Sequence, residues 1–295
     1  MNREQEEPFT LRWSDHVLRL GQRTHVMGVL NVTPDSFSDG GRYFQKERAV
    51  ERGLAMAREG ADCIDVGGES TRPYSSGVSV DEEIGRVIPV ISALRRELEI
   101  PICVDTYKAG VAREALRAGA SMINDISALR FDPHMTAVVA ETGVPVVLMH
   151  MQGTPGDMQN NPVYLDLIQE IVDFLRAAID RAVKAGARKE LILIDPGIGF
   201  GKTFDHNLQI IRELASLHVL ERPILLGTSR KAFIGHILDQ EAHARDTGTM
   251  ATIAAGALNG AHMVRVHDVQ KAVETVKVVD AIRRGCGAST EDDVS

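Results

Sequence analysis

The chain has 295 residues, which is enough for one large domain or two small ones. Its 33 Lys and Arg residues are outnumbered by 41 Asp and Glu residues, so the formal net charge is −8. This balance argues against a general nucleic-acid or membrane-surface binder, whose footprint is basic, but it leaves room for a local basic pocket. The three cysteines, Cys63, Cys103 and Cys286, are sparse and odd in number, which predicts a reducing compartment without a disulfide framework.

No segment of the sequence has the pattern of an export signal or a membrane span. The first ten residues, MNREQEEPFT, are acidic and contain no apolar signal core. No run approaches the ~20 consecutive apolar residues that a transmembrane helix needs. We therefore expect a soluble, cytoplasmic protein.

Short β-branched runs alternate with longer stretches of helical periodicity along the chain. Eight runs are strand-like: 25–31, 62–68, 101–106, 121–127, 145–150, 191–197, 223–229 and 262–267. Helix candidates lie between them, for example 46–60, 163–186 and 268–285. Several helical stretches end in Gly-Ala, at 60–61, 119–120 and 186–187, where we expect the Gly to cap the helix C-terminus.

Strands that alternate with helices predict a parallel sheet with right-handed crossovers. Eight such units in roughly 250 residues have the size of an α/β protein of the (β/α)8 TIM barrel type. A doubly wound sheet is the alternative, but no Rossmann fingerprint follows the first strand and no linker divides the chain. We predict one domain over residues 1–295. Within it, residues 1–20 should form a short strand or hairpin that plugs the bottom of the barrel, and 286–295 a flexible tail.

Polar side chains follow each predicted strand at the end where a barrel of this kind carries its active site. They are Asn31, Thr71, Arg72, Asp105, Asn124, His150, Asp195, Ser229, Arg230, Lys231, Arg265 and His267. Any one of them can equally be a strand-terminal residue that faces solvent or caps a helix, but eight strands delivering polar groups to one rim predict a site. The cationic members suit an anion, and the carboxylates match the paired N–H donors of a guanine-like heterocycle.

One segment, PGIGFGKT at 196–203, approaches the phosphate-binding pattern G-x-x-x-x-G-K-[ST]. The first Gly position is occupied by Pro196, and the segment follows a sixth strand instead of opening the domain. This mismatch removes a Gly that the phosphate loop needs. We therefore favour a Gly-rich barrel loop that packs close to a ligand over a nucleotide-hydrolysing loop.

Eight motifs, in order, resemble those of the dihydropteroate synthase family, the folate-pathway enzymes that sulfonamides target. They are GVLNVTPDSFSDGG, GADCIDVGGESTRP, ICVDTYKAGVAREAL, GASMINDIS, LMHMQGTPGDMQ, IDPGIGFGKTFDHNL, LLGTSRKAFIG and GAHMVRVHDV, spread over about residues 25–284. The resemblance implies a (β/α)8 barrel that forms a homodimer. It also implies an Mg²⁺-dependent reaction in which 6-hydroxymethyl-7,8-dihydropterin pyrophosphate and p-aminobenzoate yield 7,8-dihydropteroate and pyrophosphate.

The resemblance assigns the pterin to the depth of the barrel. The residues that would hold it there are Asp105, Asn124, Asp195 and Lys231, with Ile126 and Met149 as apolar walls. Asp195 would take the hydrogens of the 2-amino group and N3, and Lys231 would reach the ring carbonyl. Arg265 would stack on the face of the ring.

The other two subsites lie nearer the rim in the same resemblance. The Mg²⁺-pyrophosphate group would meet Asn31 as the metal contact, together with Thr71, Arg265 and His267. Arg72, a further cation at the rim, is also expected to bind substrate. The p-aminobenzoate would lie between Pro73, Phe200 and Lys231, under a 32–42 loop that carries Asp35 and Phe37 and closes over the site. The residues expected to act in catalysis are Asp35, Asp105, Lys231, Arg265 and His267.

The chain departs from the family pattern directly after Lys231, where Ala232 stands in place of a common Ser. That Ser lies where the aminobenzoate carboxylate meets a helix N-terminus, whose backbone N–H groups still attract an anion. We expect activity to survive and substrate affinity to fall by about 1 kcal/mol.

Two other functions remain open from the sequence. Pterin-binding methyltransferases share the barrel and the Asp and Asn contacts but need no pyrophosphate site. A non-enzymatic pterin-binding paralogue is also possible, because a fold does not fix a function. The segments NVTPDSFSDGG, SRK and RVHDV favour the synthase.

Overall fold

The computed structural model describes residues 9–33, 42–70 and 77–285 and contains a barrel of eight parallel strands. The strands are β3 (His25–Asn31), β4 (Cys63–Gly67), β5 (Ile102–Asp105), β6 (Met122–Asp125), β7 (Val146–Met149), β8 (Ile192–Asp195), β9 (Leu225–Leu226) and β10 (Met263–Val266). Their order is β8-β7-β6-β5-β4-β3-β10-β9, and a parallel bridge between Ile194 and Ile224 joins the two ends. The eight predicted strands and the predicted TIM barrel are confirmed.

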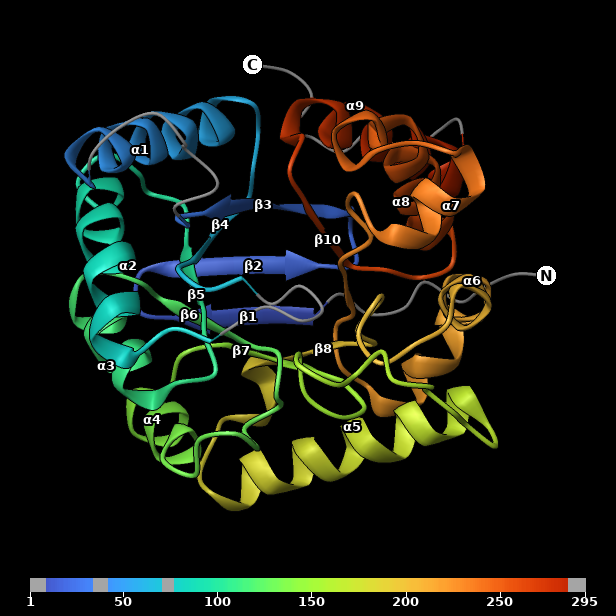
Figure 1. The fold of residues 1–295 in the computed structure, drawn as a ribbon, viewed down its shortest axis with the longest axis horizontal. Helices are drawn as coiled ribbons and strands as arrows, with labels where there is room; N and C mark the ends of the chain where they lie inside the picture. Colours follow the sequence, from blue (N-terminus) through green and yellow to red (C-terminus); the bar gives the residue numbers. More distant parts are fainter. Residues whose placement is uncertain (1–8, 34–41, 71–76, 286–295) are drawn as a thin grey trace.

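Helices surround the strands in chain order, as Figure 1 shows from α1 round to α9. They are α1 (Arg42–Arg58), α2 (Val80–Leu94), α3 (Ala109–Arg117), α4 (Met135–Thr142), α5 (Leu167–Lys184), α6 (Phe204–Arg212), α7 (Ala232–Leu238), α8 (Asp246–Leu258) and α9 (Val269–Arg284). The predicted glycine caps have positive φ angles, +98° at Gly60, +111° at Gly119 and +106° at Gly186. Each therefore adopts the left-handed conformation that ends a helix.

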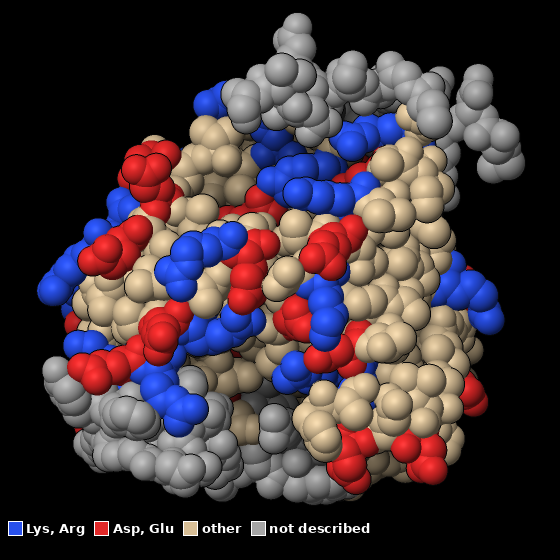
Figure 2. Space-filling model, turned by 90° about the horizontal axis from the view of Figure 1, so that it is seen from above, with Lys and Arg blue, Asp and Glu red and all other residues tan. Residues whose placement is uncertain are grey.

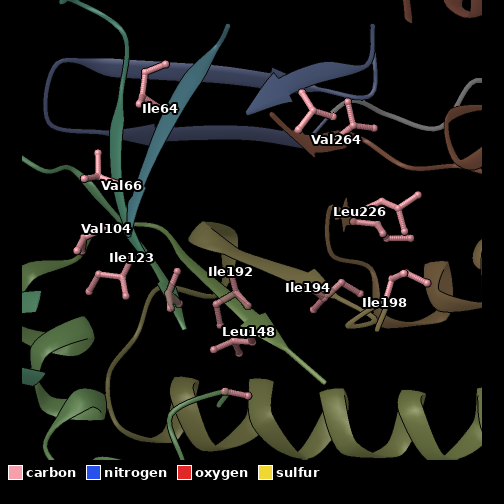
Figure 3. Close-up of a cluster of buried hydrophobic side chains, with 14 of the residues drawn as sticks. Ile64, Val66, Val104, Ile123, Leu148, Ile192, Ile194, Ile198, Leu226 and Val264 are labelled. Carbon is pink, nitrogen blue, oxygen red and sulfur yellow. The ribbon is translucent and has the colours of Figure 1, made fainter. Parts of the chain in front are cut away.

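Alternate residues of each strand point outward and form the main core with the helices. The strand residues labelled in Figure 3 are Ile64, Val66, Val104, Ile123, Leu148, Ile192, Ile194, Leu226 and Val264, and all of them are buried. Side chains on a strand alternate between its two faces, so the residues between these ones point into the lumen of the barrel. This period of two decides which residues reach the interior.

The lowest layer of the lumen is apolar and is covered by a hairpin. Its strand residues are Met27, Cys63, Cys103, Met122, Val147, Leu193, Leu225 and Met263. Leu11 and Trp13 of β1 (Phe9–Trp13) and Leu18 and Leu20 of β2 (His16–Leu20) pack onto this layer. Figure 1 shows the hairpin lying across the middle of the ring of helices. The predicted plug is therefore confirmed, and it closes the end of the barrel opposite the strand carboxyl ends.

Charge on the surface is mixed and not segregated by sign on the face that carries α1 and α9. Figure 2 shows Lys and Arg interspersed with Asp and Glu there, beside an area on the right that carries none of these residues. Within residues 9–33, 42–70 and 77–285, no helix is both long and apolar enough to cross a bilayer.

We expect Leu11→Ala to lower the free energy of unfolding by about 2–5 kcal/mol, because it removes a fully buried side chain from the plug and leaves a cavity. Urea unfolding followed by circular dichroism measures the change. Arg12→Ala is the matched control, since Arg12 is the exposed neighbour on the same strand and its loss should stay within about 0.5 kcal/mol. Equal losses in both variants would show that the hairpin does not seal the barrel.

Candidate active site

Above the apolar layer, the lumen becomes polar. Two residues further along each strand, the inward positions are Val29, Asp65, Asp105, Asn124, Met149, Asp195, Gly227 and Arg265. The pairing register aligns Asp105 with Asn124 and Met149 with Asp195, so these side chains occupy one level. The structure thus brings together four of the predicted pterin residues and Arg265, at the carboxyl ends of the strands.

The strongest interaction in this layer joins Arg265 to two carboxylates. Its Nε donates to Oδ2 of Asp65 and its Nη2 donates to Oδ2 of Asp105, each at 2.6 Å. Burial opposes the charge on Arg265, but the two carboxylates outweigh it and raise the pKa of the guanidinium. The pKa of Asp105 is also raised, chiefly by burial, while Arg265 acts in the opposite direction. The guanidinium is therefore a fixed cation in a layer whose other charged side chains are carboxylates.

Asp65 was not among the predicted site residues, although it is fully buried at the centre of the layer. Its Oδ2 accepts a second hydrogen bond, from Nδ2 of Asn124 at 3.0 Å. Its Oδ1 is buried and accepts no hydrogen bond within the described chain. The signal was present in DCIDVGG, because the alternation that turns Cys63 inward also turns Asp65 inward.

Asp195 is oriented by the loop that follows β8. Its Oδ1 accepts the backbone N–H of Gly197 at 2.6 Å. Gly197 has a φ of +71°, and a Cβ there would lie only 1.9 Å from the carbonyl oxygen of His150. Only glycine fits this position. Burial raises the pKa of Asp195, whereas the Gly197 N–H and Lys231 lower it.

Lys231 supplies a cation above the ring of acceptors. Its Nζ lies 4.2 Å from the centroid of the Phe200 ring, which fits a cation–π contact. Burial, and then the nearby charge of Arg265, lowers the pKa of Lys231 to about 8. Lys231 immediately precedes α7, so the predicted helix N-terminus at Ala232 is present.

The predicted apolar walls also come together. Ile126, Met149 and Phe200 are buried and form one cluster with Met151 and Met158. At the rim, Asn31 ends β3 and is half-buried. His267 follows β10, and its Nδ1 lies 2.9 Å from Oγ of Ser229. The remaining predicted site residues, Asp35, Phe37, Thr71, Arg72 and Pro73, lie outside the described residues, as does Cys286.

Several polar atoms of the layer have no hydrogen-bond partner in residues 9–33, 42–70 and 77–285. The acceptors are Oδ1 of Asn124, Oδ1 of Asp105 and Oδ2 of Asp195, and the donor is Nζ of Lys231. Buried polar groups are normally hydrogen-bonded. The layer is therefore suited to a flat ligand that offers several N–H donors and one carbonyl acceptor.

Comparison with known proteins agrees with this chemistry. The family model described as "Pterin binding enzyme" matches residues 27–267. A dihydropteroate synthase of Synechocystis is 49% identical over 265 residues, which cover 90% of this chain and 92% of that one. The chain belongs to the dihydropteroate synthase family.

Solved dihydropteroate synthases have the same fold. The Xanthomonas albilineans enzyme with 4-aminobenzoic acid is 47% identical with a TM-score of 0.86, covering 91% of this chain and 96% of that one. The same organism's enzyme in complex with 7,8-dihydropteroate is 44% identical with a TM-score of 0.83, covering 91% and 97%.

Two polar residues predicted for the rim of this dihydropteroate synthase barrel turn away from the lumen. His150 follows the inward-facing Met149 and so points outward, where its ring packs edge-on against Phe174 of α5 at 4.7 Å. Arg230 pairs with Asp246 of α8 through Nε and Nη2, at 2.8 and 3.1 Å. The prediction that every strand sends a polar group into the site is therefore wrong for β7, because strand alternation overrides position at the strand end.

Lys202, the lysine of the phosphate-loop-like segment at 196–203, also makes its contacts within the protein. Lys202 is 2% exposed, and its Nζ donates to the carbonyl oxygen of Phe200 at 3.0 Å. It also lies 2.9 Å from Nδ1 of His150. Burial lowers the pKa of Lys202 to about 7, and burial together with Lys202 lowers the pKa of His150 to about 2. The segment supports Phe200 and does not present a lysine to phosphate.

His150 should make stability depend on pH. Above an unfolded pKa of about 6.5 it is neutral in both states, but below this value only the unfolded chain binds the proton. Stability should therefore fall as the pH drops, with up to about 1.4 kcal/mol per pH unit from this group. In His150→Asn, which keeps an acceptor near Lys202, the slope of unfolding free energy between pH 6 and 4 should be shallower by about that amount.

Urea unfolding across this pH range tests the prediction. His243→Asn is the matched control, because His243 is exposed and its replacement should leave the slope of the wild type unchanged. The same slope in His150→Asn and the wild type would exclude His150 as a source of acid sensitivity.

Proposed function

We propose that this chain condenses 6-hydroxymethyl-7,8-dihydropterin pyrophosphate with p-aminobenzoate to form 7,8-dihydropteroate and pyrophosphate. The observation that carries the proposal is the set of unpaired acceptors facing one unpaired ammonium group in the lumen. A dihydropterin offers the matching edge, with N–H donors on the ring and its amino group, and one ring carbonyl. The solved relatives that bind 4-aminobenzoic acid and 7,8-dihydropteroate support both the substrate and the product.

In this proposal each unpaired polar atom of the layer contacts one group of the dihydropterin. Asp195 takes the 2-amino and N3 hydrogens, and its second oxygen is held by Gly197 in the orientation this needs. Lys231 donates to the ring carbonyl, while Asn124 and Asp105 accept the remaining ring hydrogens. Arg265, locked by its two carboxylates, lies against the ring face. Charge-assisted hydrogen bonds of this kind are the strong ones.

The p-aminobenzoate site adjoins Phe200 and Lys231, which already contact each other. Pro73, Asp35 and Phe37 would complete this pocket and cover it. Thr71, Arg265 and His267 would hold the pyrophosphate. These assignments follow the family resemblance of the matching positions.

Mg²⁺ is the cofactor that we infer, with Asn31 as its contact on the protein. Among the described residues, no three His, Cys, Asp or Glu side chains come together as a metal-binding group. Mg²⁺ is usually bound by one or two carboxylates together with substrate phosphates, so here the pyrophosphate would supply much of its coordination. Asn31 offers a half-buried amide at the rim. When bound, the ion would neutralise charge on the leaving pyrophosphate.

The charge pattern favours a dissociative displacement. Aminobenzoate is a weak nucleophile, whereas the electron-rich dihydropterin stabilises positive charge on its methylene carbon. Asp105 lies within the layer and stabilises such a cation. The C–O bond to pyrophosphate breaks first, the amine then forms the C–N bond, and its proton leaves to solvent. A closed site protects the cation from water.

We further propose a cytoplasmic homodimer. Cys63 and Cys103 are buried free thiols, which suit a reducing compartment. Exposed apolar residues gather on the last helices, at Leu258 of α8 and at Val278 and Ile282 of α9. An apolar face of this kind fits a two-fold contact with a second copy.

The first experiment measures pyrophosphate release from the purified protein with the pterin pyrophosphate, with and without p-aminobenzoate and Mg²⁺. We expect fast release only with all components, and slow release without aminobenzoate if the displacement is dissociative. Lys231→Met should lower kcat/KM at least tenfold, since a charged hydrogen bond contributes about 1.5–3 kcal/mol. In the wild type, kcat/KM should fall as the pH rises above about 8, where Lys231 loses its proton.

Lys277→Met is the control, because Lys277 is exposed on α9 and its loss should leave kcat/KM unchanged. Pterin binding without any pyrophosphate release would instead indicate a non-enzymatic pterin-binding protein. Release that depends strictly on aminobenzoate would argue for a concerted displacement.

Ala232→Ser should lower the KM for p-aminobenzoate about fivefold without changing the KM for the pterin substrate. A hydroxyl at the first residue of α7 adds one hydrogen bond of about 1 kcal/mol to the substrate carboxylate. Steady-state kinetics with each substrate varied in turn measure both constants. Ala232→Gly, which adds no hydroxyl, should leave the KM for aminobenzoate no lower than in the wild type.

A further inference from the structure

A single carboxylate oxygen organises two of the side chains that line the lumen. Oδ2 of Asp65 accepts from Nδ2 of Asn124 at 3.0 Å and from Nε of Arg265 at 2.6 Å. Asp65 itself is 0% exposed. It connects β6 and β10 through β4, although β5 lies between β4 and β6, and β3 lies between β4 and β10. None of the substrate roles above involves it.

This contact fixes the orientation of the Asn124 amide. A carboxamide has a donor side and an acceptor side, and without a fixed partner it can present either. An ionised carboxylate only accepts hydrogen bonds. Because Oδ2 of Asp65 takes Nδ2, the amide must turn Oδ1 away from Asp65, and Oδ1 accepts no hydrogen bond from the described residues.

The same oxygen fixes the plane of the Arg265 guanidinium. Nε is held by Asp65 and Nη2 by Asp105, so two adjacent strands, β4 and β5, hold one planar group at two points. Two hydrogen bonds to a planar fork leave little rotational freedom. The face of the Arg265 guanidinium and its remaining nitrogen, Nη1, therefore point in one defined direction.

We propose that Asp65 is a positioning residue that decides which hydrogen-bonding group the cavity offers to its ligand. By holding Nδ2 of Asn124, it makes this side chain an acceptor for a ring N–H and disfavours heterocycles with an acceptor at the same place. This inference deepens the proposed function and rests on it, since it takes the dihydropterin as the ligand. Asp65 acts through Asn124 and Arg265 and does not contact the reacting atoms.

Exchanging the two residues tests the proposal. In Asp65→Asn the fixed acceptor is lost, and in Asn124→Asp two carboxylates face each other, so each variant should bind 6-hydroxymethyl-7,8-dihydropterin at least tenfold more weakly. The double variant Asp65→Asn/Asn124→Asp restores a donor–acceptor pair with an acceptor facing the ligand. Its affinity should exceed that of each single variant at least threefold but stay below that of the wild type, because the new amide nitrogen replaces the oxygen that accepts from Nε of Arg265. Anaerobic isothermal titration calorimetry measures all four dissociation constants.

Asp125→Asn is the matched control. Asp125 is the next residue on β6, is fully buried and binds the backbone N–H groups of Ser127 and Leu129. Its replacement should lower Tm and leave the dissociation constant within twofold. If the losses of affinity of the two single variants multiply in the double variant, the proposal is overturned. Asp65 is then a purely structural residue.

Two further comparisons keep the outcome decisive. If Asp65→Asn does not fold, the double variant must bind more tightly than Asn124→Asp alone, and equal binding overturns the proposal. If the wild type does not bind the dihydropterin, the proposed function fails, and the inference fails with it. Wild-type binding without rescue rejects the positioning role alone.

Discussion

The ion pair of Arg265 with Asp65 and Asp105 is the interaction on which the rest of the site depends. A charge inside a barrel is tolerated only when it is paired and hydrogen-bonded, because removing one partner leaves an uncompensated buried charge. Here one guanidinium satisfies two carboxylates from adjacent strands. The pairing lets a polar layer exist inside the barrel, above the apolar layer that the hairpin covers, and it holds Asn124 indirectly through Asp65.

Along the same strands, the lower level of the lumen stabilises the barrel and the upper level forms the site. Residues at the lower level, such as Cys63 and Cys103, pack against the hairpin and exclude water from below. The next inward residues, Asp65 and Asp105, carry the charge of the site. A rigid apolar base keeps the polar groups in place, since strands position side chains more firmly than loops do. The loop after β8 is the exception, and there Gly197 and Lys202 supply the rigidity through hydrogen bonds.

The sequence predicted the eight strands, the barrel and the plug because hydrophobic period and turn residues report local structure directly. Strand-end positions placed Asp105, Asn124, Asp195 and Lys231 on one rim with other polar residues, and the family resemblance grouped these four as the pterin site. It failed where a side chain's direction mattered more than its position. His150 ends a strand but points to α5, and Arg230 is drawn to Asp246. For Asp65 the alternation with Cys63 indicates the inward direction, but the apolar run gives no sign of its partners, which are 59 and 200 residues distant.

The charge balance of the polar layer bears on the order of bond breaking. Three carboxylates, Asp65, Asp105 and Asp195, face two cations, Arg265 and Lys231, so the layer carries one surplus negative charge when all are ionised. A neutral dihydropterin does not change that balance, but loss of pyrophosphate makes its methylene group positive. Preorganised charge stabilises the state in which the opposite charge develops. In the proposed reaction, the carboxylates around the ring would therefore favour departure of pyrophosphate before attack by the amine when they are ionised. Arg265 bridges two of these carboxylates, Asp65 and Asp105, and so limits the repulsion between them.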